Sequence, residues 1–284
     1  ETMYPRPVEY IAPASVSDAV RELGNSDFAK IMSGGMSLLP MMKLRLLSPE
    51  LVVDIGRIAG LDQITDDGET VTIGALVRHD DTAKSELVPT ALRTAASWTG
   101  DRQVRSRGTT CGAVAHADIS ADQPSAVLAL GGTMIAQGPD GTREIAAEDF
   151  FVDVLTSALE PNEILTGIRI SKNGGGSAYE KLGRRGGHTD YAVAGASAHV
   201  SMSDGHIGSA RVALTGVGTK PSLALGVMEA LEGSDGSEAS VEAAAQRATE
   251  GVTVLEDLYG SVDYKAHLAT VMVKRAVLQA VAAS

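Results

Sequence analysis

The first 55 residues alternate between short apolar runs and stretches with helical spacing. The apolar runs predict strands at residues 8–10, 28–32 and 51–55. A serine cap followed by helical spacing, and a later mixture of Leu, Met and basic residues, predict helices at 16–23 and 38–47. The segment Ser33–Ser37 joins the second strand directly to the second helix. We therefore expect a strand, a glycine loop, a helix and a strand in succession.

The next 90 residues have a different pattern, in which turn signals separate pairs of β-rich segments. One predicted hairpin pairs 61–65 with 70–73 across Asp66–Gly68, and another pairs 133–137 with 142–146 across Gly138–Gly141. Between them, helical patterns cover residues 88–98 and 121–130. The segment Gly108–Ala117 is rich in Gly, Thr and Ala, and we predict irregular structure there.

A glycine run at Lys172–Ser177 marks the clearest change in composition and predicts a domain boundary. Beyond it the pattern predicts a three-stranded meander, with strands at 178–182, 192–202 and 207–215. Helices are then predicted at 222–231, 239–249 and 264–283. Strands followed by helices indicate an α+β fold. We expect domains at 1–174, with subdomains at about 1–55 and 56–174, and at 175–284.

Composition narrows the classes of function. The formal charge is −12, which argues against a general nucleic-acid-binding surface but permits a local basic pocket. No run is long and apolar enough for a membrane span, and the first residues lack the layout of a secretory signal, so we expect a cytoplasmic protein. Cys111 is the only cysteine. Because an iron–sulfur cluster needs about four cysteine ligands, any such cluster must come from a partner.

The glycine segment Ser33–Ser37 has the composition of an anion-binding loop. Glycine lets backbone N–H groups approach the charged pyrophosphate of a dinucleotide closely, and a following helix adds its dipole. The segment is not the G-x-G-x-x-G fingerprint, and two adjacent glycines after a strand also occur as an ordinary turn. Both interpretations stay open on these residues alone.

A second segment, Arg107–Asp118, carries small side chains at many consecutive positions. This pattern favours backbone packed against a flat or charged group. Asp122, just beyond it, either accepts hydrogen bonds from hydroxyl groups of a ligand or caps the next helix. His116 and Asp118 lack a third convergent ligand, which favours an ordinary loop histidine over a metal site.

Three segments together closely resemble the medium FAD-binding subunit of the xanthine dehydrogenase and carbon monoxide dehydrogenase family: Ile31–Arg45, Gly108–Gly112 and Ala115–Asp118. Later segments extend the resemblance over essentially the whole chain: Glu160–Leu165, Tyr179–Leu182 and Arg184–Arg185. The resemblance implies a two-part FAD-binding domain of the PCMH type. A smaller domain with a three-stranded antiparallel sheet and helices is then expected to follow.

The resemblance also implies which residues contact FAD. The first segment would wrap the pyrophosphate, the second would contact the diphosphate and ribitol, and Asp122 would bind cofactor hydroxyls. Lys181 would approach the flavin ring and Tyr191 would cover it, although Lys181 could be an exposed side chain and Tyr191 a core residue. The implied cofactor-binding set is Ser33, Gly34, Gly35, Met36, Ser37, Leu38, Thr99 (adenine side), Thr109, Thr110, Cys111, Gly112, Ala113, Asp122, Leu165, Lys181 and Tyr191.

Two positions depart from the commoner family pattern. Cys111 and Ala113 stand where that pattern has Gly and Asn. Ala113 can offer only its backbone N–H to a cofactor. No basic residue is placed by the local sequence to activate the Cys111 thiol, so we do not expect a nucleophile or a covalent flavin anchor.

The implied function is electron transfer within a heteromeric molybdenum hydroxylase. FAD in this chain would pass electrons from [2Fe–2S] clusters in a small partner subunit to an external acceptor, and a large partner would hold the molybdenum cofactor. The chain then needs no catalytic residue or metal site of its own. Two alternatives are a self-contained flavin oxidase of the vanillyl-alcohol type and a nucleotide-binding module without redox activity.

Overall fold

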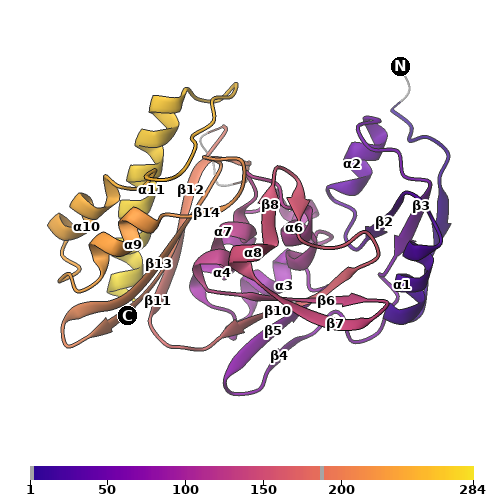
Figure 1. The fold of residues 1–284 in the computed structure, drawn as a ribbon, viewed down its shortest axis with the longest axis horizontal. Coiled ribbons are helices and arrows are strands. Elements are labelled where there is room, and N and C mark those ends of the chain that lie inside the picture. Colours follow the sequence, from indigo (N-terminus) through magenta and orange to yellow (C-terminus); the bar gives the residue numbers. More distant parts are fainter. Residues whose placement is uncertain (1–2, 186–188) are drawn as a thin grey trace.

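The computed structural model describes residues 3–185 and 189–284. Three bodies follow one another along the long axis of the molecule, in sequence order (Figure 1). A small sheet near the N-terminus lies at one end, a five-stranded sheet with helices lies in the middle, and a four-stranded sheet with long helices lies at the other end. Within the described residues, no helix is long and apolar enough to cross a membrane.

The first body is the predicted strand–loop–helix–strand unit. Its elements are β1 (Glu9–Ile11), α1 (Val16–Gly24), β2 (Ala29–Met32), α2 (Leu38–Lys43) and β3 (Leu51–Asp54). Both β1 and β2 pair in parallel with the central strand β3. Ser15 caps α1 by accepting from the N–H of Asp18 at 3.1 Å. The predictions for this unit are confirmed, except that α2 ends four residues earlier than expected.

The second body is built on an antiparallel sheet of order β4-β5-β10-β6-β7. Both predicted hairpins are present, and their elements are β4 (Ile64–Asp66), β5 (Thr70–Gly74), β6 (Thr133–Gly138) and β7 (Gly141–Ala146). The sequence pattern did not predict the central strand β10 (Ile164–Ser171), which pairs with β5 and β6. A small ribbon of β8 (Phe151–Asp153) and β9 (Thr156–Ser157) lies apart from this sheet.

The helices of the second body lie between its sheet and the neighbouring bodies (Figure 1). They are α3 (His79–Lys84), α4 (Thr90–Ser97), α5 (Arg102–Arg105), α6 (Thr110–His116), α7 (Asp122–Ala129) and α8 (Ala147–Phe150). The expectation of irregular structure at 108–117 was wrong, because α6 occupies most of it. Thr109 caps this helix by accepting from the N–H of Gly112, and Ala117 ends it in the left-handed region at φ 52°.

The third body contains the predicted meander and one additional strand. Its elements are β11 (Gly176–Gly183), β12 (Ala192–Ser203), β13 (His206–Thr215), β14 (Ser222–Leu223), α9 (Leu225–Leu231), α10 (Glu238–Ala245) and α11 (Val262–Ala282). The sheet therefore has four strands rather than three. Ser222 and Leu223 pair with β13, so the helix expected from Ser222 begins only at Leu225.

The two faces of the third sheet have different partners. On β12, Ala196 and Ala198 belong to the apolar core that α11 covers. Ser197, between them, points the other way and bonds Ser125 of α7 at 3.0 Å. This alternation is the period of two expected of a strand. The opposite face of the sheet therefore packs on the second body and brings its side chains to α7.

Candidate functional site

The two glycine-containing segments meet in space. Ser33 Oγ and Thr109 Oγ1 lie 2.9 Å apart, although 76 positions separate them in the chain. A Cβ added to Gly34 would overlap the carbonyl oxygen of Arg107, and Gly35 has a φ of +72° that disfavours other residues. A Cβ on Gly112 would lie 2.5 Å from Thr109 Oγ1 and 2.9 Å from Ser33 Oγ. Glycine is thus required by close packing where the segments cross.

A cavity of about 390 Å³ opens at this crossing, between the first and second bodies. Its lining includes residues 33–38 and also Thr109, Gly112 and Ala113. Lys30 adds a positive side chain, and Met32 and Met41 add apolar surface. Most of the residues predicted in the two segments therefore surround one cavity, which supports the prediction that both segments serve one ligand.

The backbone donors of the first segment are free. Within the described residues, no N–H of residues 33–37 makes a hydrogen bond to another protein group. The second segment differs, because Thr110 N–H bonds Val77 O at 3.1 Å and Ala113 N–H bonds Thr109 O at 3.0 Å. Free backbone N–H groups beside glycine form a concave anion site. The first segment is therefore the part of the cavity best suited to a diphosphate.

Two predicted residues of the second segment point into the protein. Thr110 is buried, and its Oγ1 lies 2.7 Å from Thr82 Oγ1 of α3. Cys111 is buried against β5, with Sγ 3.3 Å from the carbonyl oxygen of Ile73. Burial raises the pKa of the Cys111 thiol well above its usual range. Neither residue lines the cavity, so the structure does not place their side chains where a ligand there would meet them.

The buried thiol gives a simple expectation. A thiol-specific reagent such as dithionitrobenzoate is expected to leave Cys111 unmodified in the folded chain, because little thiolate forms and reagent access is blocked. In denaturant the same preparation should release one equivalent of thiolate product, counted by absorbance. Rapid reaction of the folded protein would contradict the buried position of Cys111.

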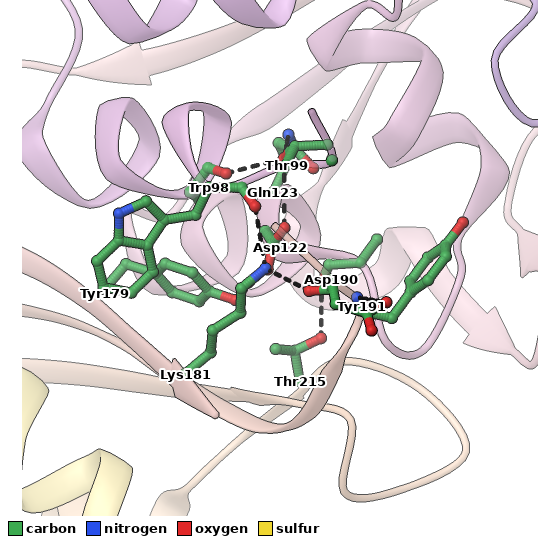
Figure 2. A network of polar contacts seen from close by, with 12 residues as sticks. Trp98, Thr99, Asp122, Gln123, Tyr179, Lys181, Asp190, Tyr191 and Thr215 are labelled. Carbon is green, nitrogen blue, oxygen red and sulfur yellow. Dashed lines mark hydrogen bonds and ion pairs between the residues drawn. The ribbon is translucent and has the colours of Figure 1, made fainter. Parts of the chain in front are cut away.

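Three further predicted residues form a buried polar network with Tyr179 beside α7, namely Thr99, Asp122 and Lys181 (Figure 2). Tyr179 and Lys181 occupy alternate positions on β11, so both side chains reach the carboxylate of Asp122. Lys181 Nζ lies 2.7 Å from Asp122 Oδ1, and Tyr179 donates to the same oxygen. Thr99 Oγ1 lies 3.3 Å from Asp122 Oδ2. None of these residues lines the cavity at the crossing of the two glycine-containing segments.

Lys181 also fixes two backbone positions. Its Nζ donates to Trp98 O at 3.2 Å and to Asp190 O at 2.8 Å, and its side chain is fully buried. Burial raises the pKa of Asp122, while the charge of Lys181 opposes that rise. Burial, followed by the charge of Asp122, raises the pKa of Tyr179 well above its ordinary value, so the phenol stays a hydrogen-bond donor.

The remaining two predicted residues lie in contrasting environments. Leu165 is buried in β10, beside the irregularity in register between Leu165 and Gly167. Tyr191 is 44% exposed, and its ring points away from the Asp122–Lys181 pair (Figure 2). An exposed aromatic ring on a fixed backbone is free to stack on a planar group. Tyr191 therefore has the accessibility that a flavin-covering residue requires.

His79 lines the cavity, and the sequence pattern did not single it out. It begins α3, and its imidazole edge occupies the space where a Cβ of Gly108 would otherwise lie. Gln123 Nε2 donates to His79 Nδ1 at 3.0 Å and to Thr99 Oγ1 at 2.6 Å, which connects the cavity to the Asp122 network. Burial, reinforced by Arg105 and Arg78, lowers the pKa of His79 to about 4. No local sequence signal could have identified this contact between distant segments.

The lowered pKa of His79 makes stability depend on pH. Below about pH 6.5 the unfolded chain takes up a proton at this residue, whereas the folded chain does so only near pH 4. The free energy of unfolding is therefore expected to fall by about 2 kcal/mol between pH 7 and pH 5 because of His79. Urea denaturation at pH 7 and at pH 5 measures the free energy of unfolding. In His79→Gln, the decrease between the two pH values should be smaller by the contribution of His79. An identical loss in wild type and variant would contradict the assignment.

Two family models match the chain. Residues 6–172 match the FAD binding domain in molybdopterin dehydrogenase. Residues 177–280 match the C-terminal domain of the CO dehydrogenase flavoprotein.

The described residues contain no group of three His, Cys, Asp or Glu side chains that could hold a metal ion.

Similar proteins span nearly the full chain. The carbon monoxide dehydrogenase medium chain of Hydrogenophaga pseudoflava is 40% identical over 96% of this chain and 97% of its own length. The nicotine 6-hydroxylase medium subunit of Paenarthrobacter nicotinovorans is 32% identical over 96% of this chain and 97% of its own.

The solved structures agree with these relatives. In the structure of Hydrogenophaga pseudoflava carbon monoxide dehydrogenase that lacks the Mo-pyranopterin moiety, one chain is 40% identical and superimposes with a TM-score of 0.93. The match covers 98% of both chains. The resemblance inferred from the sequence and the α+β organisation are thus confirmed. This chain belongs to the family of FAD-binding domains in molybdopterin dehydrogenases, with the CO dehydrogenase flavoprotein C-terminal domain following it.

Proposed function

We propose that this chain is the FAD-binding, electron-transferring subunit of a heteromeric molybdenum hydroxylase. The observation that carries the proposal is the cavity at the crossing of the two glycine segments, where the backbone N–H groups of residues 33–37 have no partner among the residues that the structure describes. The fit to FAD is good, because a dinucleotide brings a diphosphate that needs such donors. When bound, FAD supplies an electron carrier that accepts electrons singly or in pairs.

The residues fall into two groups in this proposal. The backbone of 33–38, with Thr109, Gly112 and Ala113, would hold the diphosphate side of FAD in the cavity. Tyr191 would cover the flavin ring. We propose that four further residues contact the cofactor: Thr99, Asp122, Leu165 and Lys181. Asp122 would bind hydroxyl groups of the cofactor. The mutual bonding of Asp122 and Lys181 supports a role in which the pair also fixes the backbone on which Tyr191 stands.

We also propose that the chain divides near residue 174 into the two domains expected from the sequence. One apolar core is built almost entirely from residues before this point, and a second from residues after it. Gly174 and Gly175 both have positive φ values at the junction. The first domain would bind most of FAD, and the second would contribute Lys181 and Tyr191.

The proposed partners are a small subunit with [2Fe–2S] clusters and a large subunit with the molybdenum cofactor. Relatives such as the nicotine 6-hydroxylase medium subunit are named as single subunits of larger enzymes, which supports this arrangement. Electrons would leave FAD for an external acceptor, and we propose a cytoplasmic complex. Family matches over both parts of the chain favour this function over a vanillyl-alcohol-type oxidase or a non-redox nucleotide-binding module.

Native purification of the tagged full chain from its source cells tests this function. We expect two further chains to co-purify, with iron, molybdenum and FAD in a constant ratio across the elution peak. Tagging the chain at either end and obtaining the same partners would exclude an effect of the tag. A pure single chain without iron or molybdenum, under conditions where FAD stays bound, would contradict the subunit assignment.

A further inference from the structure

Arg184 lies between two tyrosine rings. Its guanidinium carbon is 5.1 Å from the ring centre of Tyr191 and 4.5 Å from that of Tyr259. Both distances lie within the range of a cation–π contact. Tyr191 belongs to the segment before β12, whereas Tyr259 lies 68 positions later, in the segment before α11. The stack thus connects the proposed flavin-covering residue to a distant part of the chain.

The Tyr191 and Arg184 side of the stack is fixed by backbone contacts. Arg184 N–H bonds Tyr191 O at 3.0 Å, and Tyr191 N–H bonds Asp190 Oδ1 at 2.8 Å. Arg184 Nη2 lies 3.5 Å from Ser120 Oγ, while Arg184 Nε is buried without a partner in the described residues. The two ring contacts therefore add to the Ser120 contact in holding this guanidinium.

The Tyr259 side of the stack is equally well anchored. Lys265, whose side chain is almost fully buried in α11, lies 2.6 Å from Asp257 Oδ2 and 3.0 Å from Gly216 O. Asp257 Oδ1 in turn accepts from the N–H of Tyr259 at 2.8 Å. Tyr259 is 45% exposed, yet its backbone is held by an ion pair whose lysine is buried. The backbone that carries the Tyr259 ring is therefore anchored to α11 through Asp257 and Lys265.

We propose that Tyr259, acting through Arg184, is a positioning residue for the Tyr191 ring over the flavin. This rests on the proposed function, in which Tyr191 covers the flavin. Arg184 lies over the Tyr191 ring, and the residue keeps 44% of its surface exposed. The segment before α11 thus takes part in the FAD site without contacting the cofactor itself.

Flavin fluorescence of the full chain loaded with FAD tests the proposal, because a stacked tyrosine quenches flavin emission. Tyr259→Ala is expected to raise the emission of bound FAD toward the level of Tyr191→Ala and to weaken FAD binding about two- to five-fold. Tyr259→Phe keeps the ring and should restore both values. Leu258→Ala is the matched control, because the neighbouring Leu258 is 97% exposed and should not alter either value.

The outcomes separate the inference from the function on which it rests. If Tyr191→Ala raises emission and Tyr259→Ala does not, the positioning role of Tyr259 is overturned while FAD binding stands. An equal rise of flavin emission in Tyr259→Phe and Tyr259→Ala would also overturn the positioning role, because the aromatic ring would then have no effect. Failure of the wild-type chain to bind FAD would overturn both the inference and the proposed function. Arg184→Met should reproduce Tyr259→Ala, which provides a second variant if Tyr259→Ala does not fold.

Discussion

Replacing Lys181 with methionine is expected to lower the free energy of unfolding by about 3–5 kcal/mol, the usual cost of leaving one buried charge without its partner. The carboxylate of Asp122 would keep only the hydroxyl donors Tyr179 and Thr99. The loss of the contacts to Trp98 O and Asp190 O adds to the effect. Urea denaturation of the full chain at pH 7 measures the change.

The matched control is the same substitution at an exposed lysine. Lys84 pairs with Asp80 on the surface of α3, and its side chain is 71% exposed, so Lys84→Met should cost at most about 1 kcal/mol. Adding Asp122→Asn to Lys181→Met removes the orphaned charge and should recover part of the loss. Equal stability of Lys181→Met and Lys84→Met would contradict the importance of the buried pair.

The second large effect is expected at Gly34. A methyl group there would overlap the carbonyl oxygen of Arg107, so Gly34→Ala must push the two segments apart at their crossing. We expect FAD affinity to fall about ten- to hundred-fold, which corresponds to the 1–3 kcal/mol cost of overpacking a tight site. Titration of the full chain with FAD, followed by flavin fluorescence, gives the dissociation constant.

Gly24 provides the control for Gly34. It ends α1, has no atom within 4 Å of an added Cβ and has no positive φ, so Gly24→Ala should bind FAD like wild type. Thermal unfolding of both variants will show whether Gly34→Ala still folds. Wild-type FAD affinity in Gly34→Ala would show that the crossing does not determine the binding site.

Local sequence signals predicted those parts of the fold that depend on local contacts. Alternation and turn residues located both hairpins, and a serine cap located α1. Two errors arose where non-local pairing decides the outcome. The strand β14 exists because Ser222 and Leu223 pair with β13, and β10 is central because two distant hairpins flank it. The helix α6 was missed because its Gly112 and Thr110 disfavour a helix that tertiary packing nevertheless stabilises.

The candidate site was predictable to a similar degree. The glycines of both segments predicted that backbone, rather than side chains, would meet a ligand, and most of the residues named in these segments line one cavity. The sequence could not show that Asp122 contacts both Lys181 and Thr99, since three separate segments of the chain meet there. Nor could it show that His79 enters the cavity, or that Tyr259 approaches Arg184 from a segment far along the chain.

We propose that this chain binds FAD without a covalent bond. The most direct measurement is the visible absorption spectrum of the natively purified chain, followed by acid precipitation and analysis of the supernatant. We predict flavin bands in the spectrum and FAD in the supernatant, because Cys111, the one cysteine of the sequence, is buried and does not line the cavity. Flavin retained in the pellet would contradict non-covalent binding. The absence of flavin even after incubation with FAD would contradict FAD binding by this chain.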